Sequence, residues 1–108
     1  MDNNELLNPL GEILARVQTL VQLAQAEDWI ALDVAANEYQ QRVCLLEDAA
    51  YLKSIYDANL VEEAKSIIAE IQIHNQDLDA YTSIQREKVA SELRQITQSN
   101  KALNAYGQ

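Results

Sequence analysis

The chain has 108 residues and a mass of 12.2 kDa, which suffices for one domain and is too short for two. Its 17 acidic and 8 basic residues give a net charge of −9, so a nucleic-acid backbone or an anionic membrane surface would repel most of it. Two glycines and one proline provide few turns, which disfavours a sheet of many short strands. We therefore expect an all-α protein that binds neither nucleic acid nor membranes.

The single cysteine, Cys44, excludes an internal disulfide and a multi-cysteine metal site. The first five residues are polar and acidic, unlike the start of a secretory signal, and no segment has the roughly 20 apolar residues that span a bilayer. We expect a cytoplasmic protein without a metal or cofactor.

The first two predicted helices are joined by a very short connection. Asn8 can cap the first helix, over residues 8–26, and Pro9 suits its first turn. Asp28 can cap the second helix, over residues 28–50. Because the connection is short, the second helix should run antiparallel to the first. The apolar positions of the second helix have heptad-like spacing: Trp29, Leu32, Ala36, Tyr39, Val43, Leu46 and Ala50.

The turn after the second helix is predicted between Tyr51 and Ala58. Ser54 with Asp57 and Asn59 with Glu62 both resemble capping boxes, and we favour the second pair. A third helix then spans residues 59–98, and residues 99–108 form a tail that we expect to be mobile when unbound. The expected architecture is an antiparallel three-helix bundle with a long, projecting third helix and a short C-terminal segment.

The third helix is predicted to extend beyond the ends of the other two helices. Its 40 residues correspond to about 60 Å, against roughly 30 Å for each of the other helices. This leaves an apolar set without an intramolecular partner: Ile84, Val89, Leu93 and Ile96. Either another protein covers these residues, or Thr82-Ser83 breaks the helix and the last quarter folds back as a fourth helix.

The charge changes sign along the chain. Residues 1–85 hold 15 acidic and 4 basic residues, a net charge of −11, whereas residues 86–108 hold 2 acidic and 4 basic residues, a net charge of +2. The bases near the end of the last helix either complement its dipole or face an acidic partner surface.

The sequence contains no convincing catalytic constellation. His74, the only histidine, lacks the Glu-x-x-His pattern of di-iron bundles, and we expect it to face the bundle; a phosphorelay role is the alternative. The eight bases are scattered instead of converging on one pocket, so we expect no enzyme. A third possibility is a coiled-coil adaptor that forms a homodimer through Ile84, Val89, Leu93 and Ile96.

Several segments resemble the flagellar export chaperone FliT family in order and spacing over nearly the whole chain. They are residues 20–29 with Tyr39 ten positions on, Asn75 with Leu78, Gln85-Arg86, and residues 101–107. Relatives continue through an additional helix that packs back and restrains binding. This chain departs from that pattern by stopping at Gln108, so the resemblance does not carry over restraint by such a helix.

The resemblance implies a chaperone that binds the C-terminal amphipathic tail of the filament-cap protein FliD, prevents its premature assembly and delivers it to the export ATPase complex and export gate. It also implies the regulator FlhDC as a partner, as in enteric relatives. Tyr106 matches a family tyrosine implicated in partner and export-gate contacts. An amphipathic tail would lie between the second and third helices. The candidate partner-binding residues are Tyr39, Val43, Leu46, Ile68, Ile71, Ile84, Leu93 and Tyr106.

Overall fold

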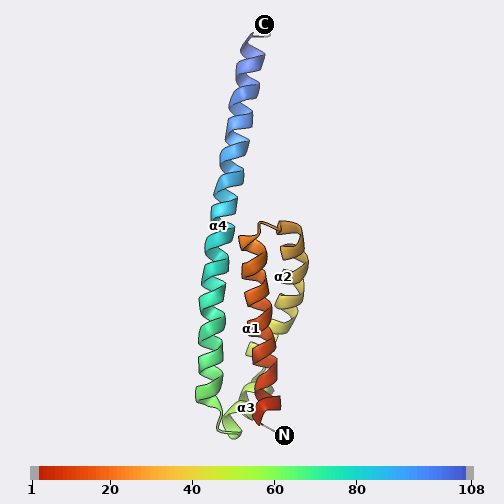
Figure 1. The fold of residues 1–108 in the computed structure, drawn as a ribbon, viewed down its shortest axis with the longest axis vertical. Helices are drawn as coiled ribbons and strands as arrows, with labels where there is room; N and C mark the ends of the chain where they lie inside the picture. Colours follow the sequence, from red (N-terminus) through yellow and green to blue (C-terminus); the bar gives the residue numbers. More distant parts are fainter. Residues whose placement is uncertain (1–2, 107–108) are drawn as a thin grey trace.

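The computed structural model describes the backbone of residues 3–106 and the side chains of residues 5–101. Within this range the protein is all-helical and has no strand (Figure 1). Its elements are α1 (Asn3–Gln25), α2 (Trp29–Val43), a 3₁₀ turn (Cys44–Glu47), α3 (Ala49–Asp57) and α4 (Val61–Tyr106). None of the described helices is both long and apolar enough to cross a bilayer.

Helix α1 is the centre of the bundle. It begins at Asn3, so the prediction that Asn8 caps it is wrong, and Pro9 lies inside the helix. The extra N-terminal turn is stabilised by Leu6 and Leu7, which pack against the core, and by the Tyr51 hydroxyl, which donates to the Leu6 carbonyl at 2.7 Å. The apolar stripe of α1 is buried: Leu10, Ile13, Val17, Leu20, Val21 and Ala24.

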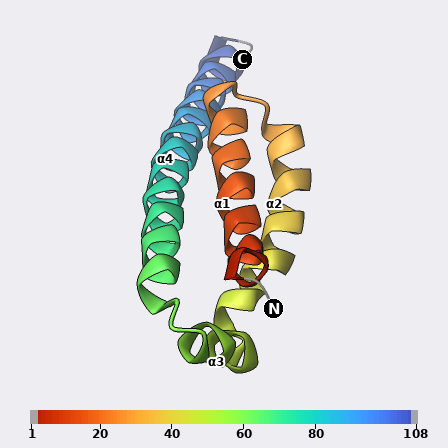
Figure 2. The same cartoon turned by 60° about the horizontal axis from the view of Figure 1, so that its bottom comes forward.

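The corner between α1 and α2 is formed by a tight helix-ending motif. Glu27 adopts a left-handed conformation with φ 58°, and the Asp28 N–H donates back to the Leu23 carbonyl at 3.0 Å. The Asp28 carboxylate accepts from the Ala31 N–H at 3.2 Å, which confirms the predicted cap of α2. The two helices are therefore antiparallel neighbours, as the short connection predicts (Figure 2).

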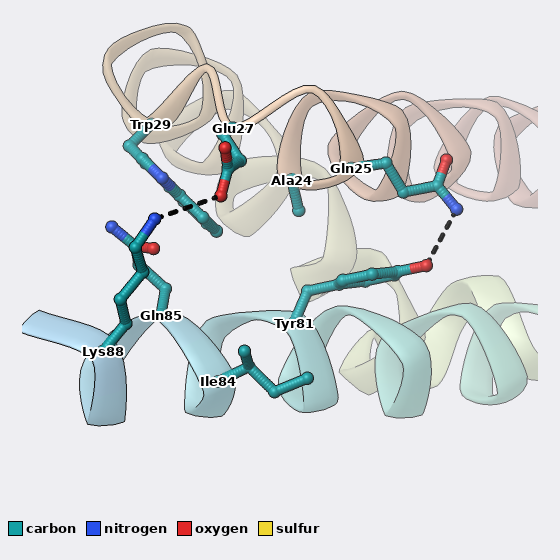
Figure 3. A pocket seen from close by; sticks show the side chains of 8 residues that line it. All are labelled: Ala24, Gln25, Glu27, Trp29, Tyr81, Ile84, Gln85 and Lys88. Atoms are coloured by element: carbon teal, nitrogen blue, oxygen red, sulfur yellow. Dashed lines mark hydrogen bonds and ion pairs between the residues drawn. The ribbon is translucent and has the colours of Figure 1, made fainter.

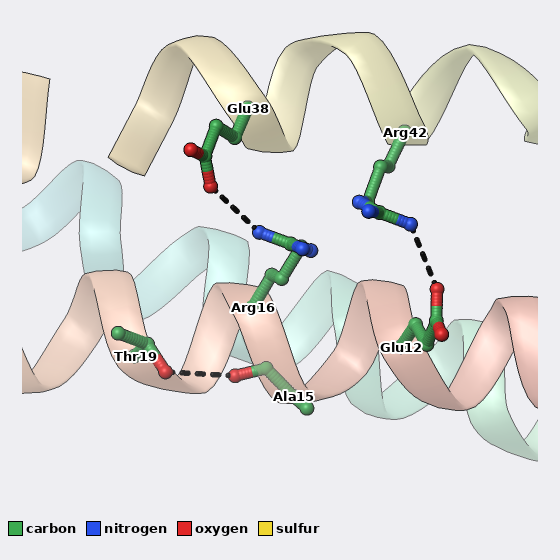
Figure 4. A network of polar contacts seen from close by, with 6 residues as sticks. All are labelled: Glu12, Ala15, Arg16, Thr19, Glu38 and Arg42. Carbon is green, nitrogen blue, oxygen red and sulfur yellow. Dashed lines mark hydrogen bonds and ion pairs between the residues drawn. The ribbon is translucent and has the colours of Figure 1, made fainter. Parts of the chain in front are cut away.

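Two ion pairs on the surface fix the register of α1 and α2. Arg16 pairs with Glu38 at 2.9 Å, and Arg42 pairs with Glu12 at 2.8 Å (Figure 4). A step of four residues forward along α1 is thus a step of four backward along α2, as antiparallel packing requires. Exposed pairs of this kind contribute about 0–1 kcal/mol each, so they specify register more than they stabilise the fold.

The helical conformation is interrupted at Asp48, within the region predicted to be one helix over residues 28–50. Helix α2 tightens into the 3₁₀ turn after Val43, and Asp48 is extended with ψ 107°. Its carboxylate accepts from the N–H groups of Ala50 and Tyr51, at 3.0 and 3.3 Å, and so begins α3. The predictions of three helices and of a turn between Tyr51 and Ala58 are therefore wrong, because a strong cap at Asp48 starts an additional helix there.

Replacing Asp48 by alanine should lower the free energy of unfolding by about 0.5–2 kcal/mol, because two amide donors at the start of α3 lose their acceptor. Urea denaturation followed by circular dichroism measures this loss. The matched control is Glu47→Ala, which removes an adjacent exposed carboxylate that caps nothing and should change stability by less than about 0.5 kcal/mol. Equal losses in both variants would contradict a capping role.

Neither predicted capping box operates. The Ser54 hydroxyl donates to the Ala50 carbonyl within α3, at 3.0 Å. Asn59 ends α3 in a left-handed conformation with φ 62°, and the Leu60 N–H donates to the Ile55 carbonyl at 3.0 Å. Asparagine tolerates this conformation better than most residues, so it serves here as a helix stop.

Helix α4 packs along α1 and runs parallel to it, while α2 packs on another side of α1 (Figures 1 and 2). Gln18 lies 3.5 Å from His74, and Gln25 donates to Tyr81 at 3.0 Å, so seven residues along α1 match seven along α4. Fully buried side chains at this interface include Leu10, Ile13, Val17, Leu20 and Ile71.

Helix α4 is uninterrupted from Val61 to Tyr106, 46 residues. The alternative of a break at Thr82-Ser83 is wrong, because the Thr82 hydroxyl is satisfied within the helix by the Asp79 carbonyl at 3.0 Å. The predicted end of the helix at residue 98 is wrong as well. No glycine or proline occurs between Gly11 and Gly107, so nothing in residues 99–106 stops the helix.

Candidate docking face on the projecting end of α4

Helix α4 leaves the bundle where α1 ends. Among the described side chains, the last polar links from α4 to the α1–α2 corner are Tyr81 with Gln25 and Lys88 with Glu27, the latter at 3.8 Å. Beyond Lys88 the helix continues for about 18 residues, or roughly 27 Å at 1.5 Å per residue. We call residues 89–106 the α4 extension; Figure 1 shows it standing clear of the other helices.

The face of α4 that is buried inside the bundle continues along this extension. Ile71 is 1% exposed, and Leu78 packs on the same core. Steps of 7 and 11 residues return to the same side of an α-helix, so Val89 and Ile96 extend this row, and Leu93 lies beside them. Their exposed fractions are 41%, 56% and 59%. We call these three residues the docking stripe.

Two hollows flank the indole of Trp29 at the point where the docking stripe begins. One, of about 240 Å³, lies against Tyr81, Gln85 and Lys88, and Figure 3 shows Trp29 and these residues around it. The other, of about 320 Å³, is bounded by Leu32, Asp33, Thr82, Gln85 and Arg86. Trp29 is half-buried, so an apolar group from a partner could contact it here without displacing the core.

Charges on the two sides of the docking stripe differ. Arg86, Arg94 and Lys101 are eight and seven residues apart, close to two turns each, and lie on one side. We call them the basic row. A shallow hollow of about 340 Å³ lies between Leu93 and the last two of these cations. The other side carries Lys88, which pairs with Glu27, and Glu92, so no positive row forms there.

The structure separates core residues from surface residues among the predicted partner-binding set. Tyr39 and Ile71 are buried, at 6% and 1% exposure, and the Tyr39 hydroxyl donates to the Asn75 side-chain oxygen at 3.1 Å. Val43, Leu46 and Ile68 are half-buried and pack on the core. Tyr39 and Ile71 therefore belong to the core, and the other three residues border it.

The remaining predicted residues lie on α4. Ile84 and Leu93 are 67% and 59% exposed. Ile84 lies on the other side of the helix from the docking stripe and borders the 240 Å³ hollow beside Trp29. The side chain of Tyr106 lies outside the described residues. The predicted set does not contain Val89 and Ile96, whose lack of a cover was predicted, and it does not contain Trp29 at the corner. We add these three residues as candidates on the basis of their exposure and position.

The other candidate chemistry is located inside the bundle. His74 is half-buried, its Nε2 lies 3.5 Å from the Gln18 side-chain nitrogen, and its Nδ1 is buried without a hydrogen-bond partner. Among the described side chains, no group of three metal-ligating residues is close enough to hold an ion. Burial raises the pKa of Tyr51, whose hydroxyl has the structural bond to Leu6 described above.

The comparison with protein families agrees with the resemblance noted from individual segments. The family model described as flagellar protein FliT matches residues 7–108, which includes the bundle and the α4 extension. No curated protein and no solved structure matches the chain significantly. Because the family match covers nearly the whole chain, the protein belongs to the FliT family of flagellar proteins.

Proposed function

We propose that this protein is a cytoplasmic export chaperone that binds the C-terminal amphipathic tail of the filament-cap protein FliD, prevents its premature assembly and delivers it to the export ATPase complex and export gate. The observation that carries the proposal is the docking stripe. Val89, Leu93 and Ile96 continue a core-facing row of α4 past the end of α1, where no other part of the described chain covers them.

An amphipathic helix fits this face in size and pattern. Helix-in-groove recognition uses apolar anchors three, four and seven residues apart, which is the spacing of the docking stripe itself. Exposed apolar rows of this kind mark interaction sites in proteins that otherwise bury their core. The chaperone would cover the apolar face of the tail and so keep it from self-association.

The direct test is titration of a synthetic FliD C-terminal peptide into the ¹⁵N-labelled chain. We expect one-to-one binding with a Kd of about 1 μM or below. Chemical-shift changes should concentrate on residues 85–101, and the fluorescence of Trp29, the only tryptophan, should change because it lies at the start of the stripe.

The control is a peptide of the same composition in scrambled order, which loses the apolar face and should not bind. Absence of binding by the native peptide at about 100 μM would overturn the proposal. Shift changes confined to α3 and the N-terminal half of α1 would overturn the assignment of the site.

A further inference from the structure

The docking stripe has a definite geometric relation to α1. Within the bundle, α1 lies parallel to α4 on the face that carries Ile71 and Leu78, and α1 ends at Gln25. A helix laid on Val89, Leu93 and Ile96 would lie roughly end to end with α1 and occupy the same face of α4. About 18 residues of helix fill the length of the α4 extension.

The charges beside the docking stripe determine which kind of partner helix can bind there favourably. Arg94 pairs with Glu87 at 2.9 Å, an exposed pair on α4 itself, whereas Arg86 forms no ion pair with any described side chain. With Lys101, these residues form a positive row on one side only, in a chain whose first 85 residues carry a net charge of −11. A docked helix therefore meets a net positive charge along one flank and no net positive charge along the other.

We propose that the segment docked on the α4 extension is an amphipathic helix with a row of acidic side chains along one flank, facing Arg86, Arg94 and Lys101. This inference rests on the proposed function and specifies the chemistry of its partner. The apolar anchors supply contact area, while the acidic row sets the rotational position of the helix and accelerates its association.

A second copy of this chain fits the same face poorly. In an antiparallel pair related by a two-fold axis, each flank lies beside its own counterpart, so one basic row would face the other. In a parallel pair the two bundles would lie side by side, each with a net charge of −11 over residues 1–85. Charge thus favours a different, acidic partner over self-association.

The test uses two synthetic 18-residue helical peptides with the same apolar pattern, one with glutamates and the other with lysines along one flank. Trp29 fluorescence reports binding to the full chain. We expect the glutamate peptide to bind at least about tenfold more tightly at low salt, with the difference shrinking as salt rises. The triple variant Arg86→Glu, Arg94→Glu, Lys101→Glu should reverse the preference.

The matched control is Lys53→Glu on α3, an exposed lysine away from the stripe that should leave the preference unchanged. Equal binding of the two peptides, or an unchanged preference in the triple variant, would overturn the inference. Sedimentation showing a dimer that Leu93→Asp dissociates would also overturn it, because the occupant would then be a second copy.

The FliD peptide separates this inference from the proposed function. If that peptide binds through the stripe while neither designed peptide is preferred, the function stands and the acidic row is wrong. If the glutamate peptide binds and the FliD peptide does not, the inferred chemistry stands and the proposed cargo is wrong.

Discussion

Replacing Ile71 by alanine should lower the free energy of unfolding by about 2–5 kcal/mol, the cost of removing a buried aliphatic side chain and leaving a cavity. Ile71 is 1% exposed and packs where α4 meets α1. Urea denaturation of the full chain measures the change. In a protein of this size, such a loss is a large fraction of total stability.

The matched control is the same substitution at Ile96, 25 residues further along the same side of α4. Ile96 is 56% exposed, so Ile96→Ala should change the free energy of unfolding by less than about 0.5 kcal/mol. A large loss at both positions would mean that the α4 extension is covered by the chain itself in solution, and the docking stripe would not exist.

Replacing Leu93 by aspartate should weaken binding of the FliD peptide by about 100-fold or more while leaving the melting temperature nearly unchanged. In the free chain this side chain is 59% exposed, so a carboxylate there costs the fold little. In the complex it would be enclosed against apolar anchors, where an unpaired charge is strongly unfavourable. Isothermal titration calorimetry and thermal unfolding measure the two effects.

Gln95→Asp provides the control for charge. Gln95 is exposed and lies two residues from Leu93, about 200° around the helix, so this variant adds the same charge on the opposite side. We expect its affinity to remain within about threefold of the parent protein. Similar losses in both variants would show that net charge, not the apolar stripe, governs binding.

The helical class of the fold follows from composition and periodicity, but the break between α2 and α3 does not. Asp48 is followed by Ala49-Ala50-Tyr51, which contains no acidic partner for a capping box, whereas Ser54 and Asn59 have such partners and misdirect the prediction. The structure uses Asp48 as a simple cap and Asn59 as a left-handed stop. Local sequence signals at these positions are of similar strength, and tertiary packing decides between them.

The position of Pro9 is a second case in which packing outweighs a local signal. Proline favours the first turn of a helix, which predicts a start at residue 8. Burial of Leu6 and Leu7 against the core, together with the bond from Tyr51, extends α1 to Asn3 instead. The bond from Tyr51 comes from α3, a helix that was not predicted from the sequence.

The projecting end of α4 could be predicted because it depends only on helix lengths. Which apolar residues remain exposed could not be fully predicted, because Ile71 and Ile96 share one side of the same helix and differ only in whether α1 reaches them. That difference is set by the corner at Glu27 and Asp28. Tyr39 is likewise buried only because α1 and α4 both lie beside it.

The free chain measures 76 Å along its longest axis and only 23 by 19 Å across. Since one unbroken helix determines that greatest dimension, a cargo helix lying alongside the α4 extension would not lengthen the particle. The complex would be thicker than the free chain at the end where only α4 is present. Its cross-section would therefore be more uniform along its length than that of the free chain.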